Sequence, residues 1–246
     1  MAIRTQNLFD PASVQAYKVS RTQLELFVDC PRCFYLDRRL GVSRVSTPPF
    51  TLNSATDVLL KKEFDSYRQK QLPHPIALKY QLDLVPYSDS RLDQWRTNSR
   101  GIQYLCPKTN LLIAGAIDDL WLNRQDQSIY LVDYKSTSTT KEITLADKWK
   151  EAYKRQMEVY QWLLRRNSIP VQNRCYFLFV NGVTSRTAFD NRLDFEMLLI
   201  PYDGNDAWVG STVQAVHDCL RSEHAPPSSK ECSWCAYRDC ASKVLA

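Results

Sequence analysis

The chain has 246 residues, of which 44% are hydrophobic and 24% are charged, so it is long and apolar enough to form one large core. The formal net charge of +5 is compatible with a polyanionic partner without requiring one. No apolar run approaches the roughly 20 residues that span a bilayer, and no hydrophobic signal segment opens the chain. We therefore expect a cytoplasmic protein with no membrane partner.

The first half of the chain predicts helices followed by a less regular stretch. Apolar spacing predicts a helix over residues 20–41, with Ser20 as its N-cap and an interruption at Pro31. A proline-containing turn at 46–49 leads to a second predicted helix over 54–69. Residues 78–85 alternate like a strand, whereas residues 94–109 look polar and irregular.

The second half predicts most of a sheet. Residues 111–122 and 128–137 are expected to form a hairpin, and a helix over 146–166 follows it. Strands are predicted at 174–183 and 195–202, and a closing helix at 206–222. This order of elements predicts an α/β sandwich around a mixed sheet.

The predicted hairpin carries candidate catalytic residues. Side chains alternate faces along a strand, so Asp133 and Lys135 should point to one side, with Val132 and Tyr134 on the other. Antiparallel pairing of the two strands would bring Asp118 to the same place. Two carboxylates can hold Mg²⁺ or Mn²⁺, and a lysine beside the metal can orient or deprotonate a water molecule. The Asp-x-Lys motif alone is common on solvated strands.

The helix over 146–166 adds further candidates. Gln156 and Tyr160 are four residues apart, so they share one face and can help to position a ligand. Tyr153 and Trp149 lie on the same stripe, and Trp149 is expected to pack in the core.

Five of the eight cysteines gather near the two ends of the chain. A reducing compartment argues against disulfides, and the other three cysteines look like packing residues. Two Cys-x-x-Cys pairs with a fifth cysteine nearby predict a metal site. The clustered residues are Cys30, Cys33, Cys232, Cys235 and Cys240.

Five motifs occur in an order that resembles a known family. They read SRTQLELFVDCPRCFYL, GAIDDLW, YLVDYKST, QMEVY and CSWCAYRDC. The chain resembles a RecB-type nuclease of the PD-(D/E)XK superfamily, and is most similar to the CRISPR-associated RecB-like exonucleases. The resemblance implies a restriction-endonuclease-like α/β core, a mixed central sheet flanked by helices. It also implies a single nuclease domain over 1–246, in which segments 20–41 and 228–246 form a cysteine-ligated metal lobe joining the two ends.

Residue by residue, the resemblance makes Asp118 and Asp133 the metal-binding acids and Lys135 the catalytic amine. It makes Gln156 and Tyr160 a pair that contacts DNA and supports the site. Asp119 is a rival for the first acid, although the Gly-x-x-Asp spacing favours Asp118; otherwise Asp119 anchors the hairpin.

The sequence departs from the family at one metal ligand. Relatives usually carry a histidine in the helix before the sheet, whereas His74, His217 and His224 all lie elsewhere. Asp57 falls in the equivalent helix and could serve as a third ligand of the Mg²⁺ or Mn²⁺ ion. Alternatively, Asp57 only favours the first turn of its helix.

For the cysteines, the resemblance implies a [4Fe–4S] cluster held by Cys30, Cys232, Cys235 and Cys240. The spacing from Cys235 to Cys240 is short for the family, and Cys33 is a fifth candidate. Pairing Cys30 and Cys33 with Cys232 and Cys235 would instead make a tetrahedral structural Zn²⁺ site.

These observations predict a metal-dependent deoxyribonuclease, an exonuclease acting on single-stranded DNA or duplex ends. Its partner would be DNA, together with proteins of CRISPR adaptation or of recombination and repair if the resemblance extends that far. The alternative is a non-catalytic nucleic-acid-binding module that keeps the nuclease fold, and the missing histidine is its best support.

Overall fold

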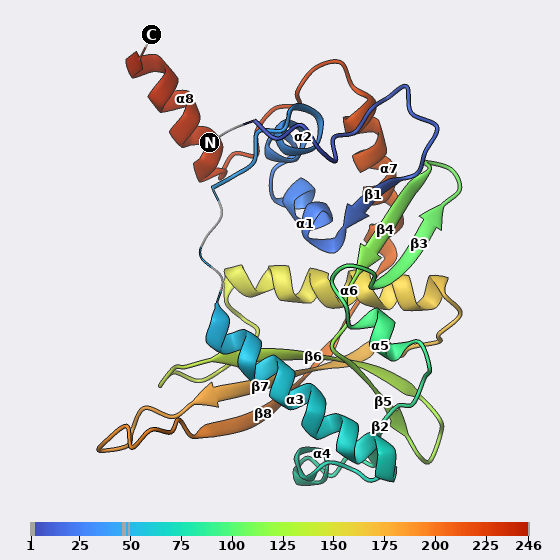
Figure 1. The fold of residues 1–246 in the computed structure, drawn as a ribbon, viewed down its shortest axis with the longest axis vertical. Coiled ribbons are helices and arrows are strands. Elements are labelled where there is room, and N and C mark those ends of the chain that lie inside the picture. Colours follow the sequence, from blue (N-terminus) through green and yellow to red (C-terminus); the bar gives the residue numbers. More distant parts are fainter. Residues whose placement is uncertain (1–2, 46–47, 49, 246) are drawn as a thin grey trace. The chain divides into compact units, whose positions relative to one another are not determined.

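The computed structural model describes residues 3–45, 48 and 50–245, and its fold is drawn in Figure 1. Its contacts divide the chain into two compact units. One unit takes in segments 1–48, 103–114 and 207–246, and the other takes in segments 49–102 and 115–206. Of the turn expected at 46–49, only residue 48 is described. No helix among the described residues is long and apolar enough to cross a membrane.

The first unit joins both ends of the chain. Its three-stranded sheet has the order β1-β4-β3, with β1 parallel to β4. Its elements are β1 (Tyr17–Ser20), α1 (Arg21–Asp29), α2 (Pro31–Leu40), β3 (Ile102–Cys106), β4 (Leu111–Gly115), α7 (Ala207–Arg221) and α8 (Ser233–Leu245).

The helix expected over 20–41 is two helices. The Ser20 hydroxyl accepts a hydrogen bond from the Gln23 backbone N–H, and the Gln23 side chain accepts one from the Ser20 N–H, which completes a capping box at the start of α1. Helix α1 ends at Asp29, and Pro31 occupies the first turn of α2. Proline suits that position because it has no N–H and its φ is already helical.

The second unit is built on a five-stranded mixed sheet of order β2-β5-β6-β7-β8, in which only the β6–β7 pair is parallel. The mixed α/β class expected from the sequence is confirmed. The elements are α3 (Thr51–Lys70), α4 (Pro75–Lys79), β2 (Leu84–Pro86), α5 (Leu92–Trp95), β5 (Asp119–Asn123), β6 (Ile129–Thr137), a 3₁₀ turn η1 (Lys148–Lys150), α6 (Glu151–Arg166), β7 (Arg174–Gly182) and β8 (Phe195–Asp203).

The two faces of this sheet differ. On one face, Val132 and Tyr134 of β6 join a buried cluster with Phe64 of α3, whose ring stacks on Trp121 at a centroid distance of 5.3 Å. On the other face, the side chains of β6 meet α6, because Gln156 of that helix is hydrogen-bonded to Asp133. Helices α3 and α6 can both be followed along the sheet in Figure 1.

The expected hairpin of 111–122 and 128–137 is wrong in its first strand. Strand β4 ends at Gly115 and belongs to the three-stranded sheet, whereas β5 begins at Asp119 and pairs with β6. The chain changes sheets between them, which a continuous apolar pattern cannot reveal.

Short elements account for the other differences. Residues 78–85 are not one strand, because His74 caps the short helix α4 and only β2 is extended. The segment 94–109 contains the end of α5 and all of β3. Helix α8 was not expected. The elements α4, β2, α5 and β3 are too short to show a periodic pattern, whereas α8 has 13 residues and was simply missed.

Candidate functional site

Strand β6 delivers Asp133 and Lys135 to the α6 side of the sheet. Asp133 is 1% exposed, and its Oδ2 forms an ion pair with the Lys135 ammonium. The Gln156 side chain joins both groups: its Nε2 donates to Asp133 Oδ1 at 2.9 Å, and its Oε1 accepts from Lys135 Nζ at 3.2 Å. The amide therefore holds the acid and the amine in one arrangement.

Tyr160 supports this amide from one turn further along α6. Gln156 Nε2 also donates to the Tyr160 hydroxyl at 3.2 Å, and the tyrosine ring is buried. The ring packs against the backbone of Gly115, where an added Cβ would lie 2.6 Å from Tyr160 Cε1. A residue without a side chain is therefore required at this close approach.

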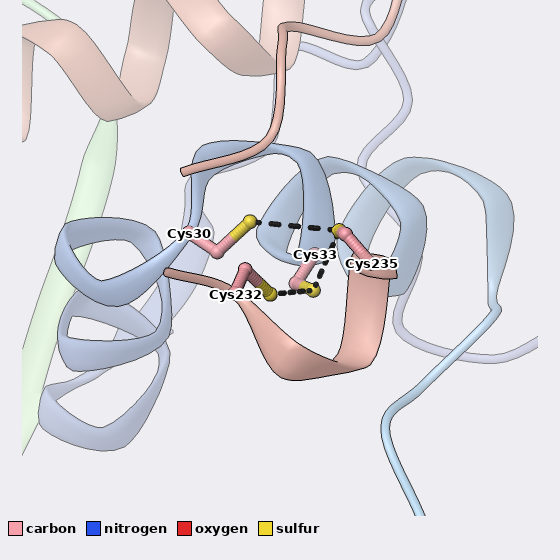
Figure 2. A group of neighbouring side chains, drawn as sticks. All are labelled: Cys30, Cys33, Cys232 and Cys235. Atoms are coloured by element: carbon pink, nitrogen blue, oxygen red, sulfur yellow. Dashed lines mark hydrogen bonds between the residues drawn. The ribbon is translucent and has the colours of Figure 1, made fainter. Parts of the chain in front are cut away.

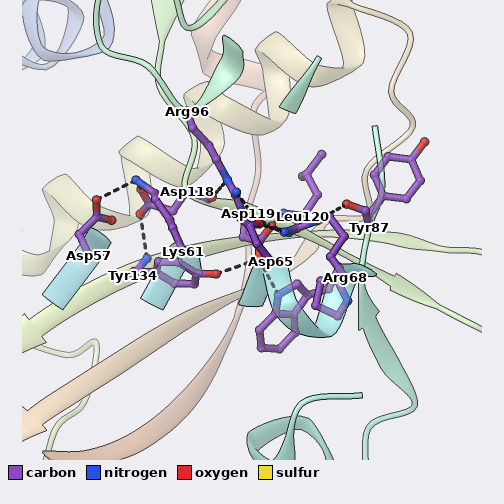
Figure 3. Close-up of polar contacts among 12 residues, drawn as sticks. Asp57, Lys61, Asp65, Arg68, Tyr87, Arg96, Asp118, Asp119, Leu120 and Tyr134 are labelled. Atoms are coloured by element: carbon purple, nitrogen blue, oxygen red, sulfur yellow. Dashed lines mark hydrogen bonds and ion pairs between the residues drawn. The ribbon is translucent and has the colours of Figure 1, made fainter. Parts of the chain in front are cut away.

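Asp118 lies in the link that precedes β5. Its Oδ2 accepts a hydrogen bond from the backbone N–H of Tyr134 at 2.9 Å, which ties it to the strand that carries Asp133 and Lys135. Its Oδ1 lies 3.2 Å from Lys61 Nζ on α3 (Figure 3). The Arg96 guanidinium donates to its backbone carbonyl at 2.8 Å.

Asp57 is connected to this group through Lys61. The two residues are one turn apart on α3, and Lys61 Nζ lies 2.8 Å from Asp57 Oδ2 (Figure 3). The lysine thus bridges Asp57 and Asp118. Within the described ranges, no group of three closely spaced acidic oxygens forms from Asp57, Asp118 and Asp133.

Asp119 occupies a different environment from its neighbour. It is fully buried and forms ion pairs with Arg68 and Arg96 (Figure 3). Its Oδ2 also accepts hydrogen bonds from the Tyr134 hydroxyl at 2.8 Å and from Trp121 Nε1 at 3.2 Å. These contacts use both oxygens of the carboxylate within the fold and join α3, β5 and β6.

The acids keep the two lysines of the site charged. Burial opposes the charge on Lys135, but Asp133 and Asp118 outweigh it and raise the pKa of the amine. Burial likewise opposes the charge on Lys61, yet Asp118 and Asp57 raise its pKa. Both side chains are therefore cations at neutral pH, and both lie within the field of Asp118.

A hollow of about 420 Å³ lies beside Lys135, lined by Ser136, Trp149 and Tyr153 among others. Lys135 Nζ is 4.6 Å from the centroid of the Tyr153 ring, and Trp149 meets that ring edge-on at 5.3 Å. Trp149 is 61% exposed, so its expected core packing is wrong. The indole instead presents a surface to solvent at the edge of the hollow.

The cysteines form a second candidate site, within the first unit. The sulfurs of Cys30, Cys33, Cys232 and Cys235 all lie within 4.8 Å of one another, and all four residues are buried (Figure 2). Cys240 is exposed and lies outside this group. The structure therefore brings together three of the four expected cluster ligands, with Cys33 as the fourth member.

The pKa values of two cysteine thiols in this group are shifted in opposite directions. Burial disfavours a charge at Cys30, but hydrogen bonds from the backbone of Cys33 and Ser229 and from neighbouring thiols lower its pKa to about 6. Burial raises the pKa of Cys33, to about 12. A group of thiols of this kind can supply thiolate ligands to a metal ion.

Sequence reasoning missed Lys61, Arg68 and Arg96. The i, i+4 spacing of Asp57 and Lys61 was the available signal for Lys61, because such a pair shares one helix face. Arg68 gave a similar signal, since it pairs with Asp65 three residues earlier on α3, although that spacing does not reveal its contact with Asp119. Arg96 gave no signal, since it directly follows the four-residue helix α5.

The donor set of Asp118 and Asp133 suits a hard divalent cation, because carboxylate oxygens are the ligands that Mg²⁺ and Mn²⁺ prefer. A mixed sheet flanked by helices, with two acids and a lysine gathered at neighbouring strands, fits the class of nucleases. The chain belongs to the PD-(D/E)XK nuclease superfamily, whose family model matches residues 51–240. This membership indicates a nuclease, and hence a nucleic-acid substrate. The curated proteins contained no match to the chain.

Proposed function

We propose that the protein is a metal-dependent deoxyribonuclease that removes nucleotides from single-stranded DNA or from duplex ends. The observation that carries the proposal is the linked group of Asp133, Lys135 and Gln156, tied to Asp118 through the backbone of Tyr134. The proposal of association with proteins of CRISPR adaptation or of recombination and repair rests on the quoted motifs alone.

In this proposal, Asp118 and Asp133 hold Mg²⁺ or Mn²⁺. The ion supplies a Lewis acid for the phosphoryl oxygens and a more acidic water molecule. Asp133 is suited to the task because it is buried and fixed by Gln156, so little freedom is lost when it binds a cation. Asp118 retains a solvent-accessible side chain, at 19% exposure.

Lys135 serves as the cation that faces the developing negative charge of the phosphoryl group. A preformed ammonium in a buried site stabilises such charge more strongly than one in water. The raised pKa of Lys135 favours this electrostatic role over that of a proton acceptor in the metal-free site. Gln156 and Tyr160 act as positioning residues, since their contacts are with Asp133, Lys135 and each other.

The hollow beside Lys135 supports an unpaired end as substrate. The exposed Trp149 indole could stack on a base that has left the duplex, and base stacking tolerates any sequence. Not every basic residue of this region is available for phosphate contacts. Lys150 is buried and paired with Asp147 at 2.8 Å, and Lys154 is paired with Glu151 at 2.5 Å.

The test is cleavage of end-labelled DNA and RNA, single-stranded and duplex, with Mn²⁺ or with EDTA. Asp133→Asn and Lys135→Ala should each lower the cleavage rate by 10²-fold or more, on the order of the loss for an electrostatic catalytic group. DNA binding should largely survive. Asp126→Asn is the matched control, because Asp126 lies in the exposed turn between β5 and β6.

Wild-type cleavage rates in either active-site variant would contradict these assignments. Preference for RNA, or nicks in closed circular DNA, would contradict the proposed substrate while leaving the nuclease assignment standing.

The alternative proposal is a non-catalytic nucleic-acid-binding module. The observation that favours it is Lys61, whose ammonium lies between Asp57 and Asp118 and so places a positive charge between two of the proposed metal ligands. Binding of DNA that persists in EDTA, with no cleavage under any divalent ion, would select this alternative.

A further inference from the structure

We propose that Cys30, Cys33, Cys232 and Cys235 hold a single Zn²⁺ ion in a tetrahedral tetrathiolate site, and that the chain carries no iron–sulfur cluster. The proposal is independent of the nuclease assignment. It departs from the cluster implied by the resemblance in both the metal and one ligand.

The sulfur–sulfur distances carry the proposal. Cys33 Sγ lies 3.5 Å from Cys232 Sγ and 3.6 Å from Cys235 Sγ, and Cys30 Sγ lies 3.8 Å from Cys235 Sγ (Figure 2). With Zn–S bonds of about 2.3 Å, a regular tetrahedron places its sulfurs about 3.8 Å apart. The observed spacing is therefore that of four ligands around one ion.

A [4Fe–4S] cluster needs more room than this group provides. In such a cluster each thiolate binds a different iron. The distance between two cysteine sulfurs then spans two Fe–S bonds and the separation of two irons, which brings it to roughly 6 Å. All four sulfurs here lie within 4.8 Å of one another. The cysteine group would have to expand by more than an ångström at every edge to take the cluster.

The backbone places the two Cys-x-x-Cys pairs in the same way. Cys30 and Cys232 each directly precede a helix, and their carbonyl oxygens accept the first helical hydrogen bonds, from Phe34 N–H at 3.1 Å and Ala236 N–H at 3.0 Å. Cys33 and Cys235 each lie three residues further on, inside the first turn. Both pairs thus present two sulfurs at a helix N-terminus, where the dipole favours thiolate.

Cys240 is poorly placed to replace Cys33. It lies on the same continuous helix α8 as Cys235, five residues further along. Five helical residues advance about 7.5 Å along the axis and turn about 140° around it. Cys240 is accordingly exposed, and it could join the other sulfurs only if α8 unwound.

Two arginines match the charge of the proposed site. Four thiolates around Zn²⁺ carry a net charge of about −2. Arg44 Nη2 lies 3.4 Å from Cys232 Sγ, and Arg238 Nη2 lies 3.2 Å from Cys235 Sγ and 3.4 Å from Cys33 Sγ. One guanidinium from each half of the site can therefore neutralise the buried thiolates. Four neutral thiols without a metal would not need this positive charge.

The first experiment measures the metal content of the untagged full-length protein, purified anaerobically from cells supplied with both zinc and iron. We expect about one zinc per chain and no acid-labile sulfide, with X-ray absorption showing four sulfurs at about 2.3 Å. About four irons with a similar amount of sulfide per chain would overturn the proposal. A single iron without sulfide would overturn the assignment of zinc.

The second experiment compares a matched pair of variants. Cys33→Ser should lower the zinc content at least tenfold, whereas Cys240→Ser should retain it. The reverse pattern would overturn the proposed ligand set. If Cys33→Ser does not fold, Co²⁺ substitution of the wild-type protein replaces it: strong visible bands of tetrahedral cobalt tetrathiolate support the four-cysteine site, and their absence contradicts it.

Discussion

Two adjacent aspartates show how strongly the surroundings decide what a residue can do. Asp119 is fully buried, and its oxygens are engaged by Arg68, Arg96, Tyr134 and Trp121. Asp118 keeps part of its carboxylate accessible and faces Lys61. Asp119 is therefore suited to hold α3, β5 and β6 together, and Asp118 is the better candidate for a metal ligand.

Asp57 should affect metal affinity more than the catalytic rate at saturating metal. Asp57 and Asp118 both form an ion pair with Lys61. Asp57 would therefore influence the ion either by binding it directly or by drawing Lys61 away from Asp118. We expect Asp57→Ala to raise the Mn²⁺ concentration needed for half-maximal cleavage about tenfold, equivalent to about 1.4 kcal/mol of lost binding. Metal titration of the cleavage rate measures this.

Asp57→His should keep part of the activity, because imidazole also binds Mn²⁺. Lys62→Ala is the control, since Lys62 is exposed and next to Lys61 in sequence. An unchanged titration curve for Asp57→Ala would mean that Asp57 only pairs with Lys61 and that the site relies on two acids.

At the scale of elements, the switch from β4 to β5 shapes the site. The chain leaves one sheet at Gly115 and enters the other at Asp119, so Asp118 lies in an irregular link and not within a ladder. Tyr160 of α6 packs on the glycine, and the same tyrosine holds Gln156. Close packing of a helix on a backbone thus supports the group around Asp133.

Gly115→Ala should lower both stability and activity. The added methyl would lie 2.6 Å from the buried Tyr160 ring, and overpacking of this kind costs about 1–3 kcal/mol of unfolding free energy. Displacement of Tyr160 would also loosen Gln156, so the cleavage rate should fall with little change in DNA binding. Urea denaturation and single-turnover cleavage measure the two effects.

Gly210→Ala provides the matched control. Gly210 lies within α7, and an added methyl there meets no atom within 4 Å. Alanine is the better helix former by about 1 kcal/mol, so this variant should be as stable as the wild type or more so. Equal stability losses in the two variants would show that the contact with Tyr160 is not the cause.

At the scale of the whole molecule, the chain folds back so that its ends share one unit. The cysteine group joins α2 to the start of α8, more than 190 residues apart in sequence, as its sulfur contacts show. A bound ion would fix this long connection, because metal binding free energy contributes directly to folding. The site formed by Asp118, Asp133 and Lys135 lies wholly in the other unit.

Removal of the metal should therefore have a local effect. After treatment with a zinc chelator, we expect hydrogen exchange to increase in α2 and α8, while β6 and β7 keep their protection. Exchange measured by mass spectrometry on the intact chain resolves these segments. A uniform rise across both units would instead show that the chain unfolds as one cooperative domain, as the single-domain expectation requires.

Local properties of the chain were predictable from its sequence. The alternation along β6 places Asp133 and Lys135 on one face, and the periodicity of α6 places Gln156 and Tyr160 together, because both patterns depend only on backbone geometry. The helices α3 and α6 and the strands β6, β7 and β8 were confirmed for the same reason. Two Cys-x-x-Cys pairs likewise predicted a metal site, and the structure groups the four cysteines of these pairs.

Tertiary structure alone decided the remaining features. The separation of β4 from β5, the burial of Asp119 between two arginines and the bridge from Lys61 to Asp118 all depend on segments distant in sequence. The choice between Cys33 and Cys240 is of the same kind, because it depends on where α8 begins and on the direction in which its side chains point. Local patterns specify which residues share a face, whereas long-range packing determines which faces meet.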